Sequence, residues 1–132
     1  MSAERCPYDY AVLRLVPRIE REEFVNAGVI LFARRLDFLG LELDEPERLF
    51  QRARALCPQL EPRPIAAALA GLANIARGEP SGGPIAALSQ SERFHWLTTP
   101  RSTLLQPSTV HSGLSEDPRA TLARLFRSLV TP

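Results

Sequence analysis

Two long apolar stretches separated by a short charged run constrain the fold of this chain more than any other feature. Residues 8–16 and 24–34 are rich in aromatic and branched side chains, and they are apolar at both odd and even positions. A strand with one wet face alternates apolar and polar residues, whereas a strand covered on both faces does not. The sequence therefore predicts two central strands, joined through Pro17 and the charged run 18–23, that need cover on both sides.

Periodicity and chain-breaking residues predict the remaining elements. Residues 38–43 alternate, with Leu39, Leu41 and Leu43 on one face and Glu42 on the other, as expected of an edge strand with one wet face. Asp44 and Glu47 have the spacing of a helix cap, and proline and glycine delimit the later helical patterns. The expected fold is α+β, with a three- to four-stranded, mainly antiparallel sheet covered by helices. The strands are expected near 8–16, 24–34, 36–43 and, as the fourth, 101–106; the helices near 45–56, 64–77, 85–97 and 118–130.

The length of 132 residues predicts a single domain over 1–132, because the breaker-rich loop at 79–84 leaves too little chain after it for a second core. No window contains the roughly 20 apolar residues of a membrane helix, and the first residues do not resemble a signal peptide. Cys6 and Cys57 are far apart and are interpreted as reduced thiols. A cytoplasmic location without membrane attachment is therefore expected.

Charge and composition exclude several function classes. The 16 basic and 15 acidic residues nearly balance, so no nucleic-acid partner is expected. Every basic residue other than histidine is arginine, and the chain contains no lysine. The phosphate loop of nucleotide hydrolases, the protein kinase fold and pyridoxal catalysis each require a lysine. The chain acting alone belongs to none of these classes, and no cofactor is expected.

The segment 94–113 concentrates both histidines, the only tryptophan and many hydroxyl residues. Arg101 and Ser102 have the chemistry of an anion site, and His111 that of a general base or a phosphate contact. Trp96 is a candidate for core packing or for a recognition surface. The alternative is a turn-rich connection whose hydroxyls bind their own backbone. The histidines and cysteines lack metal-ligand spacing, so no metal site is expected.

Polar residues also interrupt the two central strands. Asn26 and Gly28 lie in an otherwise apolar stretch, where a buried amide needs partners and a glycine often marks a bulge or a close backbone approach. Arg14 lies on the neighbouring strand. It is expected either to pair with a strand carboxylate such as Asp9 or Glu42, or to join Asn26 in a polar pocket.

The first predicted helix carries a basic face that includes Arg48 and Arg52. Such a face fits an acidic partner, although the acidic residues interleaved with it, Glu45 and Glu47, favour a solvated helix surface. Both interpretations remain open from the sequence.

Several blocks of the chain together resemble a bacterial family, domain-of-unknown-function family 3037 (DUF3037). The blocks are 8–14 (YDYAVLR), 23–32 (EFVNAGVILF), 94–97 (FHWL) and 111–113 (HSG). The resemblance carries no established catalytic residues. It implies a genomic association, because members of the family are often encoded beside a HipA-like serine/threonine kinase.

Two functional hypotheses follow. In the first, the protein is a non-enzymatic partner or regulator of such a kinase and docks through a sheet edge or the arginine-bearing helix, with surface candidates Trp96, Arg48 and Arg52. In the second, it is an anion- or nucleotide-binding domain, and an enzyme in one version of the hypothesis. Its pocket would then gather Arg14, Asn26, Arg101, Ser102 and His111.

Overall fold

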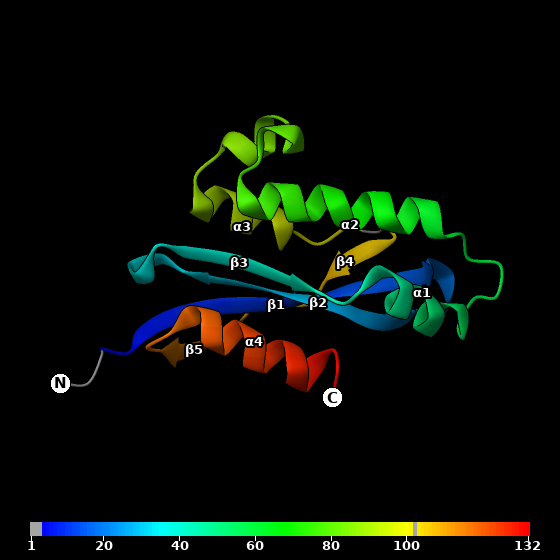
Figure 1. Ribbon diagram of the computed structural model, residues 1–132, viewed down its shortest axis with the longest axis horizontal. Helices are drawn as coiled ribbons and strands as arrows, with labels where there is room; N and C mark the ends of the chain where they lie inside the picture. The colour runs from blue at the N-terminus through cyan, green and yellow to red at the C-terminus, as the bar shows by residue number, and fades with distance from the viewer. Residues whose placement is uncertain (1–3, 102) are drawn as a thin grey trace.

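The two long apolar stretches form the centre of a five-stranded antiparallel sheet, as the pattern predicts. The structure is a computed structural model that describes residues 4–101 and 103–132 (Figure 1). Helices cover both faces of the sheet, so the α+β prediction is confirmed. Strands β3, β2, β1 and β4 are neighbours in that order, and β5 pairs with another part of β1.

The strands are β1 (Cys6–Arg18), β2 (Glu23–Ala33), β3 (Phe38–Leu43), β4 (Leu105–Pro107) and β5 (His111–Ser115). The α-helices are α1 (Pro46–Arg54), α2 (Pro62–Arg77), α3 (Gln90–Leu97) and α4 (Pro118–Leu129). Four short 3-10 turns are also present in the described ranges: η1 (Ile19–Arg21), η2 (Arg34–Leu36), η3 (Pro80–Gly82) and η4 (Pro84–Ala87). No helix in these ranges is long and apolar enough to cross a membrane.

Each face of the sheet has its own hydrophobic core. On one face, Leu13, Leu15 and Ile30 pack with residues of α1, α2 and α3. On the other face, Val29 and Leu31 pack with the apolar stripe of α4. Helix α4 runs beneath the sheet and ends near its middle, short of the β1–β2 turn (Figure 1). One end of this second face therefore lacks a helical cover among the described residues.

A β-bulge in β2 divides the covered part of the sheet from the uncovered part. Leu13 pairs with Gly28, but the next residue, Arg14, pairs with Asn26, so Ala27 is an extra residue in β2. An extra residue reverses the alternation of the strand beyond it. Asn26 consequently lies on the α4 face, whereas strict alternation from Val29 would have placed it in the other core.

Two parts of the C-terminal half differ from the sequence prediction. The fourth strand is shorter than 101–106 and covers only β4. The residues 111–113, for which a turn-rich connection is one alternative from the sequence, begin β5, which pairs with the first half of β1. The helix expected at 85–97 begins only at Gln90, because Ser89 and Glu92 form a capping box that starts it there.

Candidate functional site

A row of three polar side-chain positions crosses the sheet just beyond the end of α4. Gln106 of β4 pairs with Arg14 of β1, and Arg14 pairs with Asn26 of β2. Arg14 lies between Leu13 and Leu15, which point into the first core, so its own side chain points to the α4 face. The predicted proximity of Arg14 and Asn26 is therefore present in the fold.

Asn26 fixes the end of α4 to the bulge. Its side-chain amide donates a hydrogen bond of 3.0 Å to the carbonyl of Leu129, the last residue of the helix. Carbonyls in the last turn of a helix have no intrahelical partner, so they need one from elsewhere. The backbone carbonyl of Asn26 accepts a bond of 3.1 Å from Nη2 of Arg52 on α1. Asn26 thus joins β2, α1 and α4.

Asp44 positions both arginines of α1. Its buried carboxylate accepts bonds of 2.8 Å from Nε of Arg48 and from Nη1 of Arg52. The Arg48 side chain is 57% exposed and that of Arg52 is 33% exposed. The pKa of the Arg48 guanidinium is raised by its hydrogen bond and its attraction to Asp44.

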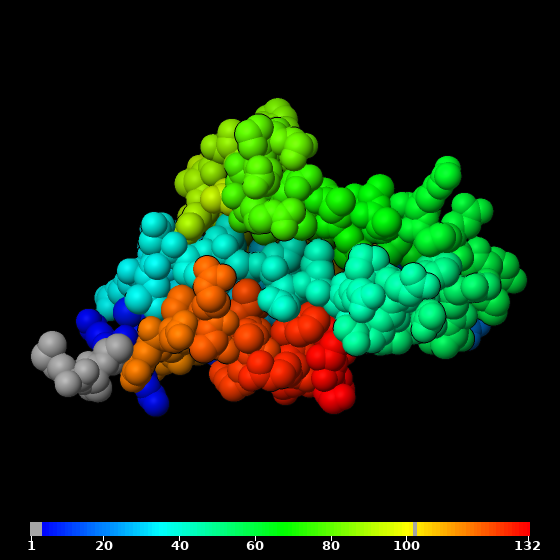
Figure 2. Space-filling view, in the orientation of Figure 1, coloured from blue at the N-terminus to red at the C-terminus, as the bar shows by residue number. Residues whose placement is uncertain are grey.

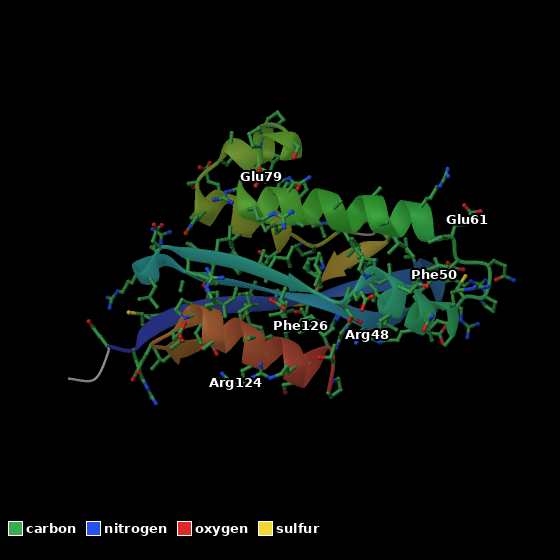
Figure 3. All side chains as sticks on the ribbon, viewed as in Figure 1. Arg48, Phe50, Glu61, Glu79, Arg124 and Phe126 are labelled. Atoms are coloured by element: carbon green, nitrogen blue, oxygen red, sulfur yellow. The ribbon has the colours of Figure 1, made fainter. Side chains whose placement is uncertain are left out.

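The capping prediction for Asp44 is therefore wrong in its chemistry. Glu45 is the N-cap residue of α1, and its side chain makes no capping bond. The carboxylate of Asp44 instead binds the two arginines and the amide N–H of Glu45. Asp44, Arg48 (labelled in Figure 3), Arg52 and the residues after α4 line a depression of about 400 Å³.

An arginine and an aromatic ring form an exposed pair at the uncovered end of the sheet. The guanidinium carbon of Arg14 lies 4.4 Å from the centroid of the Phe24 ring. Phe24 is 43% exposed, and Ile19 at the β1–β2 turn is 47% exposed. We call this patch the hairpin surface. It consists of Arg14, Val16, Ile19, Phe24 and Gln106, which together with Glu22 line a depression of about 450 Å³.

The expected ion pair of Arg14 is not formed. Asp9 lies on the opposite face of β1, where its carboxylate accepts a bond from Ser112, and Glu42 lies two strands away. Nε of Arg14 is buried and has no hydrogen-bond partner among the described residues. A buried donor without an acceptor costs free energy, about 1–3 kcal/mol in typical cases.

Arg101 and Trp96 form a second arginine–aromatic pair, on the helix-rich side of the sheet. The guanidinium lies 4.6 Å from the Trp96 ring, and it donates to the carbonyls of Trp96 and Thr99 at the end of α3. Burial lowers the pKa of Arg101 from its usual value. Trp96 is half-buried against the first core. Ser102, the other anion candidate, lies outside the described residues.

His111 lies in β5 opposite Tyr10, and the two rings are 5.4 Å apart. Tyr10 is four residues along β1 from Arg14. Neither His111 nor Arg101 lines the depression at Arg14. Of the five residues of the anion-site hypothesis, the structure brings together Arg14 and Asn26.

Most hydroxyls of 94–113 in the described part of the chain bind nearby backbone. Thr98 and Thr99 donate to carbonyls one turn earlier in α3, and Thr103 donates to Leu105. Ser108 has a special position, because its Oγ accepts from the amide of Val12 while its own amide donates to the Val12 carbonyl. It thereby fills the gap between β4 and β5 along β1. Within the described ranges, no group of three or more potential metal ligands is present.

The sequence profile of a family of proteins of unknown function, DUF3037, matches residues 10–130. The chain belongs to this family. No curated protein matches it, and no solved structure matches it. The DUF3037 match includes the bulge, the arginines of α1 and all of α4, so the whole network around Asn26 lies within the family region.

Sequence reasoning misses two residues of this DUF3037 protein that contribute to its surface, Phe24 and Ile19, and it assigns Asp44 a capping role in place of its ion pairs. The sequence pattern places Phe24 at the start of an apolar strand covered on both faces. It does not indicate where the helix that covers one of these faces ends. Ile19 does carry a signal, since it is the one large apolar residue in the charged run 18–23. An apolar residue at an exposed turn, beside other exposed apolar groups, is typical of an interaction surface.

Proposed function

We propose that this protein is a non-enzymatic partner of another protein and that it docks through the hairpin surface. The stacked pair Arg14 and Phe24 carries this proposal. The partner that the family resemblance suggests is a HipA-like serine/threonine kinase encoded nearby.

The composition of the surface supports a docking role. Aromatic residues and arginine dominate the energetics of protein interfaces, because they bury a large area and form directed hydrogen bonds. On the hairpin surface one of each is stacked beside an exposed isoleucine, with a half-buried glutamine at the edge. The bulge and the end of α4 hold these groups on a rigid strand pair.

The charge of the surface defines what the partner presents. Arg14 has no carboxylate within ion-pair distance among the described residues. The nearby Arg52, which binds the carbonyl of Asn26, adds a second positive charge, although Asp44 partly neutralises it. An incoming carboxylate would pair with the terminal guanidinium nitrogens of Arg14, which unlike Nε are not buried, and a neighbouring apolar side chain would cover Phe24 and Ile19. We therefore infer a partner segment with an acidic residue beside an apolar one.

The placement of the reactive side chains favours binding over catalysis. The His111 ring packs against Tyr10, Arg101 binds the end of α3, and Asp9 accepts from Ser112. General acid–base catalysis requires such groups to converge on one reacting atom. Here each has its own local contact.

Co-expression with the neighbouring kinase tests the proposal. The wild-type protein is expected to elute with the kinase in size-exclusion chromatography, and Arg14→Glu is expected to elute alone. Arg54→Glu is the matched control, because Arg54 also stacks on a phenylalanine, at 5.4 Å from Phe50, but on α1. Co-elution of Arg14→Glu with the kinase would show that docking uses another surface.

A further inference from the structure

The outer edge of β3 lacks the features that usually prevent edge strands from pairing. Natural edge strands are protected by charged side chains, above all lysine, by proline or a bulge, by being very short, or by a covering helix or loop. Phe38–Leu43 contains no lysine, proline or bulge, and its register with β2 is continuous over six residue pairs. Its one charged residue is Glu42, which is exposed.

The β3 edge is also accessible. Side chains of β3 lie at the floor of a groove of about 350 Å³ between α2 and α4. Figure 2 shows the surface of β3 between these two helices. On the α2 side the groove is lined by Ala73, Ala76 and, at the end of the helix, Arg77, and on the α4 side by Arg119 and Leu122. The small alanine side chains leave room for a second helix to approach α2.

We propose that a second copy of this chain pairs with this edge, β3 against β3, and forms a symmetric dimer. A two-fold axis perpendicular to the sheet keeps the α4 face of both copies on the same side, so residues of the same face must pair. This interface is separate from the hairpin surface, and the proposal does not depend on the kinase partner.

One register makes both faces complementary. If Gly40 pairs with Gly40 of the other copy, Leu39 lies opposite Leu41 on the α2 face. On the α4 face Glu42 then lies opposite Phe38, whose ring has the guanidinium carbon of Arg119 at 5.5 Å from its centroid. Symmetry gives two contacts between Glu42 and Arg119. Shifting the register by two residues in either direction moves Glu42 away from Arg119.

The complementarity within one chain favours a second copy over an unrelated strand. A partner strand for this edge needs leucines on one face and an acid near Arg119 on the other. β3 itself has these residues at these positions. Opposite charges directly across a strand pair stabilise it, whereas like charges destabilise it.

Charge reversal tests the interface. Sedimentation analysis of the wild type should give a mass of twice 14.7 kDa at concentrations of about 100 μM. Glu42→Arg and Arg119→Glu each create two like-charge contacts, and each should raise the dissociation constant on the order of tenfold or more. Both residues are exposed, so circular dichroism and the melting temperature of the monomer should stay unchanged.

Mixing the two variants provides the decisive control. In a mixed dimer the Glu42→Arg substitution of one chain faces the Arg119→Glu substitution of the other, so this contact regains opposite charges. The second contact keeps the native Glu42 and Arg119, and the mixture should therefore form a heterodimer with nearly wild-type affinity.

Arg124→Glu is the matched control for both reversals, since Arg124 is exposed on α4 but does not line the groove (Figure 3). It should dimerise as the wild type does. A monomeric wild type, a dimer insensitive to either reversal, or a mixture that stays monomeric would each overturn the proposal.

Discussion

Asn26 and Leu129 are joined by a hydrogen bond of 3.0 Å across 103 positions of sequence, from the side-chain amide of the bulge to the last carbonyl of α4. This contact fixes where the cover of the second face ends. Since it is the residue next to the extra Ala27 that reaches Leu129, the bulge and the helix end depend on each other.

Removing that amide should therefore loosen α4. Asn26→Ala leaves the Leu129 carbonyl without its partner, and we expect a loss of about 1–2 kcal/mol in the free energy of unfolding. Ser128→Ala, at an exposed position of the same helix, should change stability by less than about 0.5 kcal/mol. Urea denaturation measures both. Equal stability of the two variants would contradict a role for the Asn26 bond.

Arg52 should contribute more to stability than Arg48, although both bind Asp44. Arg52 is less exposed and also donates to the carbonyl of Asn26, whereas Arg48 is mostly solvated. We expect Arg52→Ala to cost about 2 kcal/mol and Arg48→Ala less than about 1 kcal/mol. Denaturant titration of the two variants gives the comparison, and the reverse order would contradict the network described above.

Gly28 and Gly71 should respond to alanine with opposite signs. A Cβ at Gly28 would lie 2.5 Å from the carbonyl oxygen of Glu42 and 2.7 Å from the Leu43 side chain, so β3 would have to move. A Cβ at Gly71 in α2 would meet nothing within 4 Å. We expect Gly28→Ala to cost about 1–3 kcal/mol and Gly71→Ala to add about 0.5–1 kcal/mol. A Gly28→Ala variant that melts at or above the wild-type temperature would contradict the close approach of β3.

We expect Arg14 to lower the stability of the unbound protein while it contributes to binding the partner. Its buried Nε has no acceptor among the described residues, so Arg14→Met, which packs on the Phe24 ring, should raise the free energy of unfolding by about 1 kcal/mol. Stabilising replacements of this kind are typical of functional positions. A clear loss of stability in Arg14→Met would show that the arginine has a structural role.

The central strands and the α+β architecture can be predicted from sequence, because their signal is local. Residues 8–16 and 24–34 are apolar on both faces, and a covered sheet accommodates two such strands. The helix at 64–77 is predicted nearly correctly, since proline begins α2 and Gly78 ends it with a positive φ of 70°.

The features that cannot be predicted depend on contacts distant in sequence. β5 is polar, contains Gly113 and shows no alternation, and it is a strand because β1 offers unpaired backbone there. Asp44 has the spacing of a helix cap, but Arg48 and Arg52 compete for its carboxylate. Gly28 does indicate a bulge or a close backbone approach near this point of β2, but the extra residue is Ala27, and an alanine in an apolar strand carries no sign of that.

The same distinction applies to the candidate site. Arg14 and Asn26 are identifiable from the sequence because polar residues in apolar strands need an explanation. Phe24 is not, because its exposure follows from the end of α4, more than 100 residues later. A surface that is exposed only because a distant helix ends before covering it leaves no signal in the neighbouring sequence.

The affinity of the purified kinase for this protein and for Arg14→Met, measured by titration calorimetry, tests the docking account most directly. The account predicts that the variant binds at least about tenfold more weakly while its melting temperature is equal to or higher than that of the wild type. Equal affinity for both proteins, or no binding by the wild type, would contradict it.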